Sequence, residues 1–148
     1  MLAPLLLGSL MVVGNMAIQI WALLLVVGFL IRRMELVDDG STGAHGTRLI
    51  GTVVLLLFLG HLLQFATWAV LFVALDEFQE FSTAFYHSSV NFTSLGYGDI
   101  VMSERWRLLG GLEAANGVLM FGLSAGAILS MMNRVFMRGQ HLPGGDAP

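Results

Sequence analysis

The chain has 148 residues, of which 56% are hydrophobic and 11% are charged, and its formal net charge is -3. An ordinary globular domain carries roughly a quarter charged residues, so this composition is that of a membrane protein. The absence of cysteine excludes disulfides and thiolate metal sites, and the negative charge without a basic cluster argues against a nucleic-acid partner.

The first predicted element is an N-terminal transmembrane helix (residues 1–31), in which Leu2 to Ile31 contains no charged residue. This stretch exceeds the roughly 20 residues needed to cross a hydrocarbon core of about 30 Å. A cleaved signal peptide is the alternative, but the stretch lacks a basic leading region and is too long for a signal's apolar region. We therefore expect a retained helix.

A polar loop is predicted at residues 32–48, and a second apolar helix at residues 48–75. A shorter helix is predicted at 82–93, with Ser82 as its N-cap and Glu80 placing negative charge beside its N-terminus. About eleven helical residues reach roughly 16 Å, or half a bilayer. The sequence therefore predicts a re-entrant helix rather than a span here.

The most informative motif follows this short helix; it is the heptad Thr93-Ser94-Leu95-Gly96-Tyr97-Gly98-Asp99. Gly96 and Gly98 adopt backbone angles that other residues avoid, so an extended chain can turn successive carbonyls to one side. Rings of such carbonyls can replace the hydration shell of a potassium ion. Ser94 supplies a hydroxyl oxygen at one end of this strand, whereas Tyr97 can brace the strand and Leu95 can pack behind it.

The heptad resembles the selectivity filter of the tetrameric potassium channel family, of the bacterial type with two transmembrane helices in each pore domain. This chain has an extra N-terminal helix. The resemblance covers residues 48–138 and implies an outer helix at 48–75, a pore helix at 82–93, a filter at 93–99 and an inner helix at 107–137. The implied fold is an all-α membrane protein with three transmembrane helices, a re-entrant pore helix and a selectivity filter.

The resemblance also implies the ligands and the assembly. An ion-binding filter of residues 93–98 would hold K⁺ at Ser94, Leu95, Gly96 and Tyr97, with no organic cofactor. One filter strand cannot surround an ion, so four chains are expected to form a homotetramer with cyclic symmetry in a lipid bilayer.

Two departures from the family concern the support of the filter. The proline that commonly follows the filter is absent, so we expect a more mobile outer turn after Asp99. Where some relatives carry a buried glutamate facing the filter aspartate, this chain has Val90. Tyr86 matches an aromatic position whose polar tip reaches that aspartate, so we expect a hydrogen bond from Tyr86 to Asp99.

Glu113 lies in the outer half of the inner helix, and an ionisable group at membrane depth is a functional candidate. One alternative is that it accepts hydrogen bonds behind the filter and supports it. The other is that it lies close enough to the interface to stay hydrated.

Further along the inner helix, Gly117 corresponds to the family's hinge glycine, and a plain packing glycine is the alternative. Placing the hinge there predicts a pore-facing row at helical spacing, composed of Val118, Phe121, Ala125 and Leu129. Apolar residues in this row would suit a gate that closes by dewetting.

Two polar pairs lie within the predicted spans. Asn15 and Gln19 are four residues apart, and His61 and Gln64 are three apart, so each pair shares one helix face. We expect these pairs to form hydrogen bonds that dock the first helix onto the outer helix.

The arginines predict the orientation. Two of them, Arg105 and Arg107, fall on the filter side of the spans, and five fall on the other side: Arg32, Arg33, Arg48, Arg134 and Arg138. This excess predicts that the loop at 32–48 and the short tail at 139–148 are cytoplasmic and that the N-terminus is outside. We expect this short tail to carry no soluble regulatory domain. The expected location is the cytoplasmic membrane of a bacterium.

The expected function is a potassium-selective channel, not an enzyme. A weakly selective cation channel or a pore-like subunit that does not conduct is the alternative. A remote third reading, an intramembrane serine hydrolase, arises because residues 122–126 match G-x-S-x-G around Ser124. That motif marks a nucleophile only at a sharp strand-to-helix turn, which this apolar helix does not provide.

Overall fold

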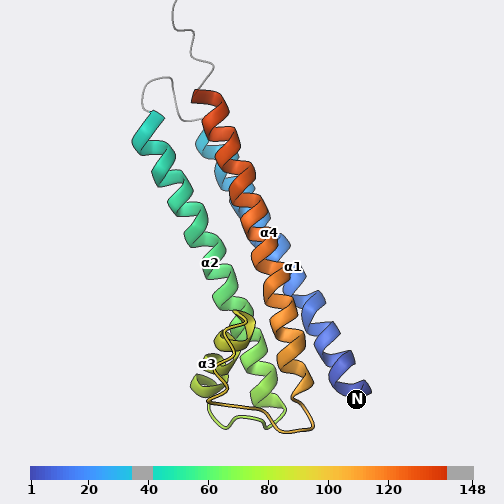
Figure 1. The fold of residues 1–148 in the computed structure, drawn as a ribbon. Helices are drawn as coiled ribbons and strands as arrows, with labels where there is room; N and C mark the ends of the chain where they lie inside the picture. Colours follow the sequence, from blue (N-terminus) through green and yellow to red (C-terminus); the bar gives the residue numbers. More distant parts are fainter. Residues whose placement is uncertain (35–41, 140–148) are drawn as a thin grey trace, which may run out of the picture.

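The computed structural model describes residues 1–34 and 42–139. Their regular structure consists of helices α1 (Leu2–Met34), α2 (Thr42–Ala74), α3 (Phe81–Phe92) and α4 (Leu108–Gly139). Figure 1 shows α1, α2 and α4 as long rods that run side by side, with the short α3 across one end. The predicted all-α fold is confirmed for the described residues.

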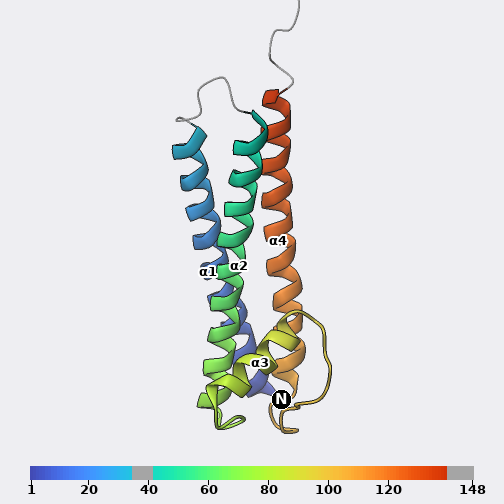
Figure 2. The ribbon, with the colours of Figure 1, turned by 90° about the vertical axis from the view of Figure 1, so that its left-hand side faces the viewer.

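Three segments are long and apolar enough to cross a membrane: Leu2–Arg32, Gly46–Ala74 and Leu108–Asn133. The chain is therefore a multi-pass membrane protein. α3 has 12 residues and is about 18 Å long, which fits half of a bilayer. Figure 2 shows that α3 and the loop after it lie at the end of the bundle where α1 begins.

α2 begins at Thr42, before the expected start at Arg48. Helix propagation adds one hydrogen bond for each residue fixed, so a long apolar helix readily extends into flanking polar sequence. The rest of the expected loop, from residue 35 to residue 41, and the tail from residue 140 lie outside the described residues.

The turn after α2 directs the chain back into the bundle. Asp76 has φ of 61°, and the amides of Asp76 and Glu77 donate to the carbonyls of Val73 and Phe72, each at 3.0 Å. This pattern is a Schellman motif, in which a left-handed residue closes the helix end.

α3 then begins with Glu80 as its N-cap residue, so the expectation that Ser82 caps the helix is wrong. The Ser82 hydroxyl instead donates to the Glu80 carboxylate at 3.3 Å. Because the carboxylate of Glu80 lies at the helix N-terminus, its charge still suits the helix dipole.

The apolar core has two parts. The larger part surrounds α3 at the filter end; its buried members are Phe65, Trp68, Ala69, Phe72, Phe78, Ala84, Phe92, Trp106, Leu109 and Met120. The smaller part lies toward the other end of the bundle and contains Val26, Val53, Leu57 and Met131. Buried polar side chains lie between the two parts along α1, α2 and α4, namely Asn15, Gln19, His61, Gln64 and Ser124.

Candidate ion-binding filter and its support

The filter follows α3 without a regular helix or strand, and its backbone alternates. Ser94, Gly96 and Gly98 have positive φ values of 58°, 59° and 72°, whereas Leu95 and Tyr97 between them do not. Alternating left- and right-handed residues keep a chain extended while turning successive carbonyls to the same side. The sequence prediction that the two glycines supply unusual angles agrees with this geometry.

The hydrogen bonds at the start of the filter all run back to α3. The amides of Ser94 and Leu95 donate to the carbonyls of Asn91 and Val90 at 2.8 and 3.0 Å, and the amide of Gly96 also reaches the Val90 carbonyl at 3.3 Å. Within the described residues, the carbonyls of residues 94–98 accept no hydrogen bond. These oxygens are therefore free to coordinate a dehydrated cation.

The positive φ of Ser94 gives a reason for serine at this position. A left-handed backbone costs an L residue about 1–2 kcal/mol, and branching at Cβ makes the crowding worse. Serine supplies a hydroxyl oxygen here without a second branch at Cβ.

The side chains of Leu95 and Tyr97 point away from this protomer's core, with exposed fractions of 54% and 68%. We expected Tyr97 to brace the filter and Leu95 to pack behind it. Both side chains are largely exposed in the single chain, so these roles stay predictions.

Two side chains of α3 contact the C-terminal end of the filter, at Asp99 and Ile100. The Tyr86 hydroxyl donates to the Asp99 carboxylate at 2.8 Å, as expected from the sequence. This hydrogen bond raises the pKa of Tyr86, because the phenolate form would lose it and would repel Asp99. His87, which sequence reasoning missed, bonds through Nδ1 to the carbonyl of Ile100 at 3.1 Å.

Glu77 holds the loop beyond the filter. Its carboxylate accepts the amide of Ser103 at 2.7 Å and the hydroxyl of Ser103 at 2.5 Å. The expected mobility of a turn without proline is therefore opposed by this clamp and by the His87 contact. Glu77 and Ser103 are too far apart in sequence for a local pattern to reveal the clamp.

Glu113 lies behind α3 and is fully buried. The Ser88 hydroxyl contacts Glu113 at 2.5 Å and the carbonyl of Phe65 at 3.0 Å, so Ser88 joins α3 to both α4 and α2. This burial favours the support alternative over a hydrated carboxylate. Val90 is also buried, and its contribution to the filter is through its carbonyl.

Gly117 lies where α4 meets the end of α3. A Cβ on Gly117 would lie 1.8 Å from the carbonyl oxygen of Phe92. Packing alone therefore requires glycine here. In the row expected to face the pore, Val118, Phe121, Ala125 and Leu129 are all exposed in the single chain, which leaves that face free.

The comparisons with known proteins agree with this architecture. Residues 51–134 match the sequence profile of a family described as "Ion channel". This match covers more than half of the chain and includes α3, the filter and nearly all of its two flanking spans. The chain belongs to the ion channel family.

A curated relative is the potassium voltage-gated channel subfamily A member 2 of Oncorhynchus mykiss, which is 34% identical over 104 residues. The alignment covers 67% of this chain but 21% of that relative, so the chain spans about a fifth of the relative's length. No solved structure gives a significant match.

The polar side chains within this channel-family bundle form a closed ring. Gln19 Nε2 donates to Ser124 Oγ at 2.9 Å, and Ser124 Oγ lies 3.1 Å from His61 Nε2. His61 Nδ1 lies 3.0 Å from Gln64 Oε1, and Gln64 Nε2 donates to Gln19 Oε1 at 3.1 Å. The donors and acceptors match around the ring when His61 is neutral with its proton on Nδ1.

The ring extends what the sequence predicted. The pairs on α1 and α2 do meet, and Asn15 joins them through Thr67 Oγ1 at 3.0 Å. Sequence reasoning missed the contribution of Ser124 on α4. The available signal was a serine within the last apolar span, but only the crossing of α2 and α4 shows that Ser124 faces His61.

The contact between Ser124 and His61 also bears on the hydrolase reading. A serine nucleophile needs an oxyanion hole and a carboxylate that supports the imidazolium. Ser124 lies inside α4, where backbone amides bond within the helix, and the amide of Gln64 occupies the place of the carboxylate. The contact therefore serves helix packing.

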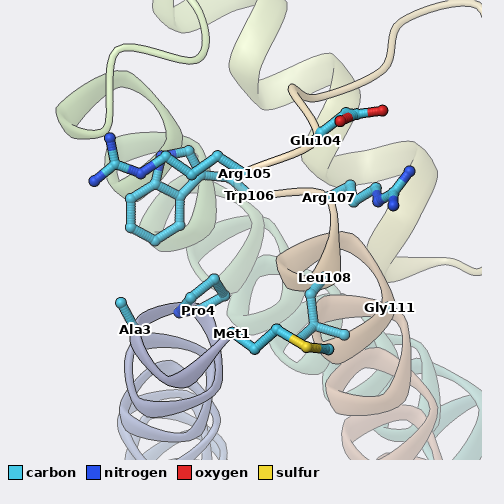
Figure 3. Close-up of a pocket in the computed structure, with 9 residues that line it drawn as sticks. All are labelled: Met1, Ala3, Pro4, Glu104, Arg105, Trp106, Arg107, Leu108 and Gly111. Carbon is cyan, nitrogen blue, oxygen red and sulfur yellow. The ribbon is translucent and has the colours of Figure 1, made fainter.

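One pocket of about 610 Å³ opens at the filter end, outside the filter itself (Figure 3). It is lined by Met1, Ala3, Pro4, Glu104, Arg105, Trp106, Arg107, Leu108 and Gly111. The Arg105 guanidinium lies over the Trp106 ring at 5.0 Å, a cation–π contact. Because no filter residue lines it, this pocket is not part of the ion path.

Proposed function

We propose that the chain forms a potassium-selective channel that conducts K⁺ passively through a carbonyl-lined filter. The observation that carries the proposal is the alternating backbone of residues 94–98, whose carbonyls are free of hydrogen bonds. Such carbonyls can replace water around K⁺. The Leu95-Gly96-Tyr97-Gly98 sequence and the potassium channel named among the relatives support the choice of ion.

The conducting form in this proposal is a homotetramer. A single filter strand offers oxygens to one side of an ion only, and four strands around a cyclic axis enclose it. The exposure of Leu95 and Tyr97 supports this assembly, because large apolar side chains beside a pore would otherwise face water or lipid.

Within this assembly, each filter residue has a defined part. The carbonyls of Ser94, Leu95, Gly96 and Tyr97 coordinate K⁺, and the Ser94 hydroxyl adds an oxygen at the inner end. Thr93 and Gly98 complete the ion-binding stretch. Tyr86, Asp99, Val90 and Glu113 support it from α3 and α4.

The gate in this proposal lies on α4. Val118, Phe121, Ala125 and Leu129 line the pore, and bringing four such rows together would expel water from the conduction path. Gly117 allows α4 to approach the end of α3 and is the proposed bending point.

We place the filter mouth and the N-terminus outside the cell and the far ends of α2 and α4 in the cytoplasm. The excess of arginines at the cytoplasmic ends supports this orientation. The proposed location is the cytoplasmic membrane of a bacterium.

Flux through proteoliposomes tests the proposal. With the full-length chain and a K⁺ gradient, we expect K⁺ efflux that barium blocks and that Na⁺ does not replace. Equal Na⁺ and K⁺ permeability would select the weakly selective alternative. Absence of flux from chains that form tetramers would select the subunit that does not conduct.

Two glycines provide a matched control. An added Cβ meets no atom within 4 Å at Gly96 or at Gly51, but only Gly96 has positive φ. Gly96→Ala is therefore expected to abolish selective flux through backbone strain, whereas Gly51→Ala is expected to keep it.

A fluorophosphonate probe tests the hydrolase alternative. Labelling of the wild-type chain, but not of Ser124→Ala, would support that alternative.

A further inference from the structure

His87 lies on α3 between the filter exit and the aromatic core. Its exposed fraction is 5%, and its ring packs against Phe72 and Phe78 at centroid distances of 5.5 and 4.8 Å. Both ring nitrogens have partners. Nδ1 lies 3.1 Å from the carbonyl oxygen of Ile100, and Nε2 lies 2.8 Å from Asn91 Nδ2.

These partners fix the protonation state of His87. A carbonyl oxygen can only accept, so Nδ1 carries a proton and donates it to Ile100. The Asn91 amide nitrogen can only donate, so Nε2 is unprotonated and accepts. The docked ring is therefore the neutral Nδ1–H tautomer, and a second proton on Nε2 would face another donor.

The charged groups around His87 come from several elements. Asp99 at the filter end and Glu77 before α3 act on the ring, Tyr86 is its neighbour on α3, and Glu113 on α4 reaches α3 through Ser88. Burial has the largest effect and lowers the pKa of His87, whereas the hydrogen bond to the Ile100 carbonyl and the carboxylates of Asp99 and Glu77 favour a charged ring to a smaller extent.

We propose that neutral His87 is a positioning residue for the filter mouth: it holds the carbonyl of Ile100, and protonation from the mouth side releases this hold and reduces conduction. The inference rests on the proposed channel function. Ile100 directly follows Asp99, so its carbonyl fixes the chain where the filter ends.

The direction of the effect follows from linkage. A histidine whose pKa is lowered when docked binds its proton more readily when undocked, so acid shifts the ring toward the undocked state. The docking free energy is fully present above the ordinary pKa of about 6.5 and is lost as the pH falls through the lowered value. Acid on the mouth side therefore disfavours the docked His87 ring and, with it, the ordered chain at the filter exit.

Side-specific acidification of proteoliposomes tests the inference. When the pH on the filter-mouth side of the membrane is lowered from about 7.5 to about 5, wild-type K⁺ flux is expected to fall by roughly tenfold. His87→Gln keeps a donor and an acceptor without titrating, so it should conduct at neutral pH and show a flat profile. His45→Gln, at the opposite end of α2, is the matched control and should keep the wild-type profile.

A second variant separates titration from simple structural damage. Asn91→Asp places a carboxylate at Nε2, which favours the protonated ring in its docked position. Its flux is expected to fall less in acid than that of wild type. Equal acid inhibition in wild type and His87→Gln would overturn the inference, and so would unchanged inhibition in Asn91→Asp.

A spectroscopic measurement tests the docked tautomer of His87 separately from the channel function. In ¹⁵N-histidine spectra of the full chain in nanodiscs, with His45, His61 and His141 each identified by substitution, the remaining signal belongs to His87. A neutral ring protonated on Nδ1 at about pH 7 supports the inference. The opposite tautomer or an imidazolium would overturn it. Absence of K⁺ flux at neutral pH would instead count against the proposed function.

Discussion

The carbonyl oxygen of Phe92, the last residue of α3, lies directly against Gly117 of α4, where a Cβ would be 1.8 Å away. The end of α3 and the middle of α4 are therefore in backbone contact. Any bending of α4 at Gly117 would move the support of the filter with it.

Gly117→Ala is accordingly expected to destabilise the protein. The added methyl group cannot fit without moving backbone, and overpacking of this kind costs about 1–3 kcal/mol. Gly111→Ala on the same helix is the control, since an added Cβ there meets no atom within 4 Å. Thermal unfolding in detergent is the measurement. If Gly117→Ala were as stable as Gly111→Ala, the glycine would serve bending alone.

Tyr86→Phe removes the hydroxyl that donates to Asp99 at 2.8 Å. The filter exit then loses one of its two contacts with α3, so we expect faster loss of current during sustained conduction. Ser89→Ala is the control, because in the described part of the chain the Ser89 hydroxyl bonds only within α3, to the Tyr86 carbonyl at 2.7 Å. Recordings from planar bilayers provide the time course. An unchanged conductance and time course in Tyr86→Phe would contradict a supporting role.

The two hydrogen bonds between Glu77 and Ser103 predict that local opening of the loop increases in steps as the bonds are removed. Glu77→Ala removes the acceptor of both hydrogen bonds, whereas Ser103→Ala removes only the one from the hydroxyl. Each lost bond in this exposed setting is expected to cost about 1 kcal/mol, or roughly a fivefold increase in local opening.

Hydrogen exchange at the Ser103 amide measures that opening. We expect the exchange rate to rise in the order wild type, Ser103→Ala, Glu77→Ala. Glu104→Ala serves as the control, since Glu104 makes no hydrogen bond or ion pair within the described residues. Faster exchange in Glu104→Ala than in Glu77→Ala would show that the clamp does not hold the loop.

The polar ring predicts an energetic coupling between α1 and α4. In a double-mutant cycle of Gln19→Leu and Ser124→Ala, the coupling free energy is expected to be about 0.6 kcal/mol and at most about 1.7, the range for hydrogen bonds between transmembrane helices. Unfolding in mixed micelles measures it. The same cycle with the exposed Ser130→Ala should be additive, and equal coupling in both cycles would contradict the ring.

The elements that the sequence predicts well are those that depend on local chemistry. Backbone groups in lipid must bond within their own helix, so the three apolar stretches had to be helices. The two glycines of the filter likewise indicate a backbone with positive φ. That Asn15 and Gln19 share one helix face follows from their spacing of four residues alone.

The features that the sequence does not predict depend on how helices cross. Ser124 completes the ring and His87 reaches Ile100 only because of the packing of α3 and α4. Glu77 and Ser103 meet across a loop that contains the whole of α3 and the filter. The N-cap position was missed because Glu80 makes no capping hydrogen bond that a capping pattern would recognise.

The polar ring also constrains how the chain is made. Asn15, Gln19, His61 and Gln64 enter the bilayer on the first two spans, whereas Ser124 arrives on the last one. Until α4 has left the ribosome and inserted, Gln19 Nε2 and His61 Nε2 each lack their Ser124 partner in a medium that offers no water. Final docking of α1 must therefore wait for the last span to be synthesised, and a chain stopped after α3 is expected to be an early target for membrane proteases.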